Sequence, residues 1–211
     1  MNKLKFSAVF LVFGFYGFSQ TNFNNLSLEF SAGYTNPIKP YLTRYKSGFA
    51  GFTNINIAAR YMFSESFGVR LEYVNDRFIT DSENKAGTYF NRFGAQGVYN
   101  LGKALDLLYI TNEKIGLLTH AGVGYTLSKP VGENFTEQIG SLVVGFTPQV
   151  KLNSRVAFFA DLSSVINFKQ HYRYDGSLAS PEADPTTGFH YNISVGIMLY
   201  IGEEKYHNDW Y

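Results

Sequence analysis

Residues 189–201 read F-H-Y-N-I-S-V-G-I-M-L-Y-I and alternate between two kinds of side chain along their whole length. The odd-numbered positions are all apolar or aromatic, whereas the even-numbered positions include His190, Asn192, Ser194 and Gly196. A period of two indicates a β-strand whose two faces meet different environments. A strand of this length is long for a soluble protein and suits a tilted strand that crosses a bilayer.

The same alternation recurs in seven further segments, so the sequence predicts eight strands. Their apolar rows cover residues 26–34, 55–63, 67–73, 93–101, 115–125, 142–152, 156–168 and 189–201. Tight turns at 64–66 and 153–154 alternate with long polar loops at 36–48, 76–88, 127–138 and 169–187. Short turns at one end and long loops at the other are typical of a bacterial outer-membrane barrel. The expected fold class is therefore all-β, as an eight-stranded antiparallel up-and-down transmembrane β-barrel.

The two rows of each strand differ in volume, and this difference decides which row faces outward. Alternation alone fits both a membrane barrel and a soluble ligand carrier. The interior of an eight-stranded barrel is just wide enough for its own side chains. The apolar rows are rich in Phe, Tyr, Leu and Ile, whereas the opposite rows carry glycines such as Gly33, Gly122 and Gly196. We therefore expect the bulky rows to face lipid, since so apolar a coat is tolerable only there.

The two ends of the chain have their own composition. Residues 2–5 are basic, residues 6–18 are apolar, and a small-residue site precedes Gln20, which is typical of a secretory signal peptide. We expect residues 1–19 to be a signal peptide, residues 20–202 the outer-membrane barrel, and residues 203–211 a tail that extends into the periplasm. An even number of strands leaves both barrel ends in the periplasm and the long loops outside the cell.

Composition excludes several kinds of partner. The net charge of +1 gives no reason to expect nucleic acid, and the absence of cysteine excludes disulfides and thiolate metal sites. The acidic loop residues lack the spacing of a calcium-binding loop. We expect no metal and no cofactor.

Aromatic residues occur at both ends of the predicted strands, which predicts two interfacial girdles. At the loop ends these residues are Tyr34, Tyr73, Tyr125, Phe168 and Phe189, and at the turn ends they are Tyr61, Phe63, Phe67 and Tyr99. Pro148 lies within a predicted strand and has no N–H for a closed ladder, so we expect a bulge or a kink there.

Charged residues of both signs lie on the inward rows. The candidate lumen network consists of Glu29, Arg60, Arg70, Glu72, Arg92, His120, Lys151 and Asp161. Charges in a narrow lumen are costly unless they are paired, so we expect a salt-bridge network that plugs the barrel. The alternative is a small gated pore that conducts ions past the same groups.

The sequence allows two further hypotheses about function, an enzyme and an adhesin or receptor. An enzyme would require His120, Asp161 and Ser163 to meet in the lumen, but the sequence offers no nucleophile motif or oxyanion donor, so we expect no catalysis. An adhesin or receptor would use the loop at 169–187, where Tyr172 and Arg173 are good contact residues.

One turn-side connector, residues 103–114, is unusually long and apolar. Its side chains Leu105, Leu107, Leu108 and Ile110 are expected either to pack under the barrel or to lie on the membrane surface.

Two resemblances support the barrel. Ser194, Gly196, Leu199 and Ile201 match a polar-x-Gly-x-x-apolar-x-apolar ending that resembles the assembly signal of outer-membrane barrels. With the segments 95–102, 146–150 and 207–211, the chain resembles the N-terminal domain of the outer membrane protein A (OmpA) family. The resemblance implies a structural role in envelope integrity, alone or as a subunit of an envelope complex. It also implies contact with outer-membrane lipid and lipopolysaccharide, and with the barrel-assembly machinery during insertion. Nothing after Gly202 could supply the peptidoglycan-binding domain that follows the barrel in some members, so the sequence is either that of a barrel-only member or a fragment of a longer chain.

Overall fold

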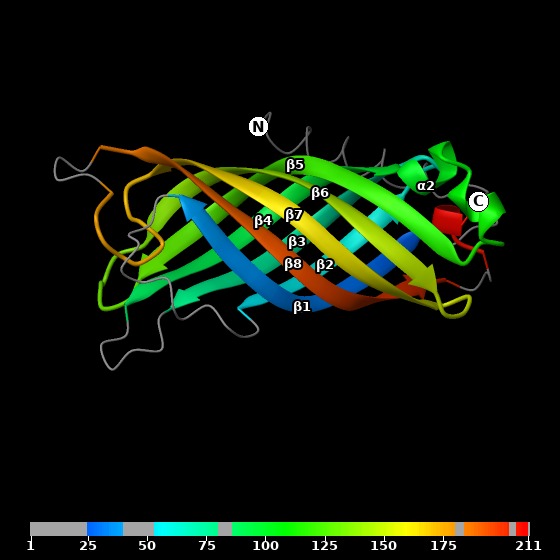
Figure 1. Ribbon diagram of the computed structural model, residues 1–211, viewed down its shortest axis with the longest axis horizontal. Coiled ribbons are helices and arrows are strands. Elements are labelled where there is room, and N and C mark those ends of the chain that lie inside the picture. Colours follow the sequence, from blue (N-terminus) through cyan, green and yellow to red (C-terminus); the bar gives the residue numbers. More distant parts are fainter. Residues whose placement is uncertain (1–24, 40–52, 80–85, 180–183, 203–205, 211) are drawn as a thin grey trace, which may run out of the picture.

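The computed structural model describes residues 25–39, 53–79, 86–179, 184–202 and 206–210. These residues form a closed barrel in which every strand is antiparallel to both neighbours in the order β1 to β8. The strands are β1 (Leu26–Lys39), β2 (Asn54–Met62), β3 (Phe67–Ile79), β4 (Gly87–Asn100), β5 (Ile115–Pro130), β6 (Glu137–Lys151), β7 (Val156–Gln170) and β8 (Thr186–Ile201). Figure 1 shows the strands tilted against the long axis of the barrel. The predicted fold class is confirmed.

The bulky rows face outward, as the side-chain volumes predict. Leu71, Val123 and Val195 are 62%, 64% and 57% exposed, whereas the inward-facing Arg70 and Asp161 are each 2% exposed. A barrel of this size can enclose only a narrow set of side chains, so the remaining apolar surface covers the outside.

The first and last strands close the barrel through close backbone contacts. Their pairing runs from Leu26 opposite Ile201 to Lys39 opposite Phe189. A Cβ atom on Gly196 would lie 2.2 Å from the carbonyl oxygen of Phe30 on the neighbouring strand. Only glycine fits that position without a shift of the backbone, which explains a glycine in the middle of a long strand.

The strands run further at the loop end than the sequence predicts. The expected loop at 76–88 is shorter, because β3 continues to Ile79 and β4 begins at Gly87. The loops at 127–138 and 169–187 are shortened in the same way by β5, β6, β7 and β8. β1 likewise continues to Lys39, but β2 begins only at Asn54, so the first connector is shifted along the chain and not shortened. Outward positions such as Asn75 and Arg77 are polar there, so the apolar alternation stops although the ladder of backbone hydrogen bonds continues.

The expected bulge at Pro148 is wrong. Pro148 pairs with Leu117 on one side, while on the other side the pairing passes from Phe146–Leu162 to Gln149–Phe159 without a change of register. The missing N–H interrupts the ladder locally but does not shift it. Register shifts occur instead between Pro37 and Lys39 and between Asn167 and Gln170.

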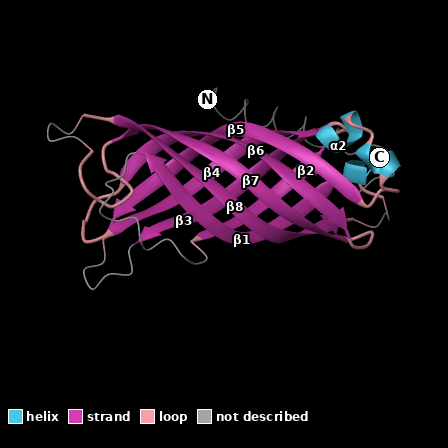
Figure 2. Ribbon diagram, in the orientation of Figure 1, coloured by secondary structure: helices cyan, strands magenta, loops and turns pink. Residues whose placement is uncertain are grey.

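Short helical segments gather at the turn end of the barrel (Figure 2). They are α2 (Leu101–Ala104) and α3 (Leu107–Ile110) between β4 and β5, and the 3-10 helix η2 (Asn208–Trp210) near the end of the chain. Among the described residues, no helix is long and apolar enough to cross a membrane. The predicted signal peptide, residues 1–19, lies outside the described residues.

Candidate functional site

An unbroken row of alternating basic and acidic side chains runs through the lumen. We call it the charge ladder: His190, Asp76, Arg92, Glu72, Arg70, Glu29, Arg60 and Asp209. In that order, the nitrogen–oxygen distances between successive side chains are 3.5, 3.8, 3.4, 3.2, 2.8, 3.2 and 2.6 Å. Every member is buried. Charges this deep are tolerable because each one has a neighbour of opposite sign or a hydrogen-bond partner.

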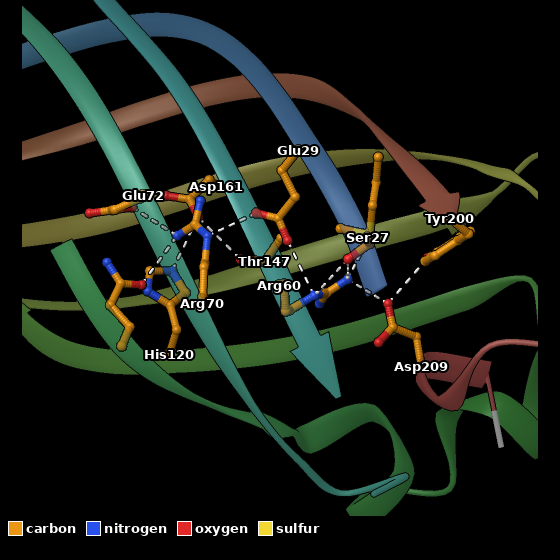
Figure 3. Close-up of polar contacts among 12 residues, drawn as sticks. Ser27, Glu29, Arg60, Arg70, Glu72, His120, Thr147, Asp161, Tyr200 and Asp209 are labelled. Carbon is orange, nitrogen blue, oxygen red and sulfur yellow. Dashed lines mark hydrogen bonds and ion pairs between the residues drawn. The ribbon is translucent and has the colours of Figure 1, made fainter. Parts of the chain in front are cut away.

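Arg70 stands at the centre of this ladder (Figure 3). Its Nε donates to Glu29, and its Nη1 donates to Gln96 at 3.2 Å. Nη1 also lies 3.6 Å from Asp161, which forms a side branch. His120 Nε2 is 3.1 Å from Asp161, whose other oxygen accepts a hydrogen bond from Ser163. One guanidinium therefore joins three carboxylates contributed by three different strands.

An aromatic layer lies within the lumen at the loop end. Tyr174 belongs to the loop between β7 and β8, yet its side chain is fully buried against Phe78, Phe90 and His190. Its hydroxyl lies 3.0 Å from His190 Nδ1, which connects this layer to the charge ladder. We call Tyr174, Phe78, Phe90 and Ile139 the loop-side plug.

Residues 206–210 lie in the turn-side mouth of the barrel, contrary to the expectation that the tail extends away from it. Trp210 is 1% exposed and its indole Nε1 donates to Tyr200 at 3.0 Å. Asp209 binds Arg60, and its backbone oxygen accepts from Asn100. We call residues 206–210 the tail plug. A segment too short to fold alone is held here because its partners already line the barrel mouth.

Ionisation differs between the two plugs. Burial raises the pKa of Tyr174, so its phenol stays neutral at any physiological pH. Burial alone would also raise the pKa of Asp209, but the Arg60 guanidinium and then His207 outweigh burial and lower it. Asp209 is therefore a carboxylate that holds the tail plug by charge.

The structure joins seven of the eight predicted lumen residues. Glu29, Arg60, Arg70, Glu72 and Arg92 are ladder members, and His120 and Asp161 form the branch. Lys151 is not part of it. Its Nζ lies 3.2 Å from Glu113 and 5.5 Å from the centroid of the Trp210 ring, at the edge of the mouth.

Three ladder members were missed by sequence reasoning. Asp76 falls in a segment that reads as loop, and Asp209 falls in a tail that reads as unfolded. His190 occupies an inward position of its strand, but nothing in the sequence shows that a carboxylate lies across the barrel. Continuing the inward row of the third strand beyond residue 74 would have found Asp76.

The predicted girdle residues lie on the outward rows, except Phe63, which follows β2 in the turn. Phe67 and Tyr99 pack at a centroid distance of 5.1 Å at the turn end, and Tyr73 packs on Phe93 at the same distance. Just beyond Tyr73 the outward row becomes polar, and the Tyr73 hydroxyl donates to Asn91 at 2.8 Å. The remaining candidates Tyr34, Tyr61, Phe63, Tyr125, Phe168 and Phe189 are partly or largely exposed. Their interfacial role stays a prediction.

The residues of the predicted assembly signal divide between the two faces of β8. Ser194 and Gly196 point into the barrel, whereas Leu199 and Ile201 lie on the lipid-facing row. In the part of the chain that the structure describes, no three acidic or histidine side chains are grouped so as to hold a metal ion.

Comparison with known proteins finds solved structures with a similar fold. No family model and no curated protein matches the chain. Among solved structures, Neisserial surface protein A (NspA) is similar with a TM-score of 0.53 and 11% identity, over 83% of this chain and 97% of that one. The N-terminal β-barrel domain of Pseudomonas aeruginosa OprF gives a TM-score of 0.48 and 10% identity, over 85% and 98% of the two chains. OprG from the same organism gives a TM-score of 0.48 and 12% identity, over 87% and 100%.

At this level of identity the likeness to NspA concerns architecture alone. It agrees with the closed barrel described above. The chain therefore has the OmpA-like fold of an eight-stranded transmembrane barrel, with its apolar rows on the outside.

Proposed function

We propose that the protein is a structural element of the outer membrane that supports envelope integrity, alone or as a subunit of an envelope complex. The observation that carries the proposal is the set of buried, paired side chains within the lumen. The charge ladder occupies its length, and the two plugs cover its ends. A barrel whose lumen is obstructed in this way suits a structural role in the envelope and not the transport of solutes.

Energetics favour a plug over a small gated pore. An ion that passed Arg70 would have to displace a guanidinium from Glu29 and Glu72, with both partners buried. Breaking a buried pair costs about 3–5 kcal/mol. Such a path would also require Tyr174 and Trp210 to leave their places.

The proposed orientation follows the loop lengths. The loop end would face the cell exterior and lipopolysaccharide, and the turn end with the tail plug would face the periplasm. We further propose that the barrel-assembly machinery binds the end of β8, where Leu199 and Ile201 point outward. Other envelope proteins are candidate partners at either end.

We propose no catalytic activity. Ser163 donates its hydrogen bond to Asp161 and not to His120, so the three groups do not form a nucleophile–base pair. All three are buried within the lumen. Hydrolysis of lipid A by the purified protein, lost on His120→Ala, would overturn this part of the proposal.

Recognition through the loops is the second candidate function. Tyr172 packs on Phe135 at a centroid distance of 4.8 Å, and Arg173 donates to the backbone of Ala179 at 2.8 Å. A loop that is already ordered loses less entropy when it binds a partner.

Deletion of the gene followed by complementation separates these functions. The structural proposal predicts that the deletion raises entry of a hydrophobic fluorescent probe into cells. The wild-type gene and a Tyr172→Ala, Arg173→Ala variant should restore the barrier equally. Normal probe entry with loss of binding to a surface, unrestored by the loop variant, would instead establish an adhesin. Reduced uptake of a small hydrophilic solute after deletion would establish a pore.

A further inference from the structure

The connector between β4 and β5 presents apolar side chains outside the barrel. Leu105, Tyr109 and Ile110 are 53%, 87% and 70% exposed, and we call them the rim patch. The exposed fractions of Tyr109 and Ile110 exceed those of the lipid-facing strand residues such as Val123 at 64%. In water each such side chain would forfeit about 1.5–3 kcal/mol of burial energy. An exposed patch of this kind marks a contact surface.

The rim patch is held in a fixed position. Leu108, which lies between Leu105 and Tyr109 in the sequence, is buried in the same cluster as Tyr200 and Trp210. Asn100 caps α2 by accepting from the Lys103 backbone N–H at 3.0 Å, and Lys103 itself pairs with Glu65 of the preceding turn. The segment therefore cannot simply fold over to bury its exposed residues.

Backbone strain also fixes this shape. Asp106, Asn112 and Glu113 adopt φ values of 54°, 51° and 58°, a region that non-glycine residues seldom occupy. Strain of this kind persists only where surrounding contacts impose it. The connector thus has a defined geometry that leaves Leu105, Tyr109 and Ile110 exposed.

The connector that carries the patch leads directly into the lipid-facing row of β5. Ile115, which follows the connector, is 45% exposed on the outward row of β5 and pairs with Val150, which is 46% exposed on β6. Figure 1 places α2 beside the turn end of β5, at the rim of the barrel. The segment between Lys103 and Lys114 also contains Asp106 and Glu113, so it carries no net charge that would select an anionic partner.

We propose that residues 101–114 form an interfacial anchor, in which the rim patch inserts into the phospholipid leaflet at the turn end of the barrel. Short apolar segments that carry an aromatic residue lie favourably at the boundary between headgroups and acyl chains. Leu108 holds the segment against the tail plug from inside, while the rim patch holds it to the membrane from outside. The anchor requires only that the outer rows face lipid, and it is independent of the proposed role in envelope integrity.

Spin labelling tests the anchor directly, since the chain has no cysteine of its own. Single Tyr109→Cys, Phe146→Cys and Arg155→Cys variants are labelled with a nitroxide and folded into phosphatidylcholine vesicles. Collision with oxygen reports lipid, and collision with a water-soluble nickel chelate reports water. Phe146 is the control within the lipid-facing band, and Arg155 is the control on the neighbouring turn at the same end.

The anchor predicts that the label at position 109 collides more with oxygen than with nickel, at a shallower depth than the label at 146. The label at 155 should show the reverse preference. A label at 109 that behaves like the one at 155 would overturn the proposal. Protection from both reagents would overturn it as well, because it would show that a second copy of the chain covers the patch. If Tyr109→Cys fails to fold, Ile110→Cys provides the same readout.

Discussion

Arg70 is the residue at which most of the buried charge converges. Glu29, Glu72 and Asp161 all lie against its guanidinium. Each also has a second basic neighbour, which is Arg60, Arg92 and His120 respectively, so removal of Arg70 leaves three carboxylates to share the remaining partners. Removing one partner from a buried ion pair leaves an uncompensated charge, and this costs more than the pair itself contributes. Arg77 lies on the same strand but faces outward, where it bonds Asn75.

Replacing Arg70 by methionine should therefore lower the free energy of unfolding by about 3–5 kcal/mol. Arg77→Met is the matched control and should cost less than about 1 kcal/mol, because exposed charges contribute little. Urea unfolding in lipid vesicles, followed by circular dichroism, measures both. Equal losses in the two variants would show that the charge ladder does not stabilise the barrel.

Asp209 makes docking of the tail plug dependent on pH. Arg60 and His207 lower its pKa in the docked state, so the stabilisation is complete above the ordinary aspartate pKa of about 3.9 and is lost as pH falls through the lower docked value. Trp210 is the only tryptophan in the chain, so its emission reports docking alone. We expect the emission to stay constant from pH 7 to about 4 and to shift to the red below that.

The Asp209→Asn variant serves as the control for this titration, since it has no carboxyl to protonate at that position. It should show no such step over the same range. A red shift of the wild-type Trp210 emission at a pH at or above the ordinary aspartate pKa would contradict the role of Arg60 in lowering the pKa of Asp209. The same step in both proteins would assign it to another group.

Neighbouring strands depend on glycine where their backbones approach closely. In the β4–β5 pair, a Cβ on Gly122 would lie 2.1 Å from the Ala95 carbonyl oxygen, whereas a Cβ on Gly97 would find its nearest contact, the Ala121 carbonyl oxygen, at 3.9 Å. We expect Gly122→Ala to separate the two strands locally and to reduce the yield of folded, heat-modifiable barrel on electrophoresis. Gly97→Ala should fold like the wild type. Normal folding of both variants would mean that this pair of strands tolerates the added methyl group.

The eight strands and their outward faces followed from the period-two pattern, because lipid imposes one apolar row on each membrane crossing. The positions at which the strands end on the loop side could not be predicted from this pattern. Residues such as Asn75 and Arg77 are paired in the β-ladder, but they lie beyond the apolar band. Inward charges could be assigned to the lumen, but their partners could not, because those lie on distant strands or, for Asp209, on the tail.

The whole molecule is layered along its axis. The loop-side plug, the charge ladder and the tail plug follow one another within a shell of lipid-facing side chains. Each layer is built from segments far apart in the sequence, such as Asp209 and Arg60. We therefore expect that removal of either plug would expose the buried charge ladder to water.

The central claim is that this lumen is closed to ions, and planar-bilayer recording of the folded protein tests it most directly. We predict no steady conductance above that of the bare lipid membrane, for the wild type and for Arg77→Met alike. Discrete, lasting conductance steps in the wild type that change in size or disappear on Arg70→Met would contradict the account and would establish a pore through the charge ladder.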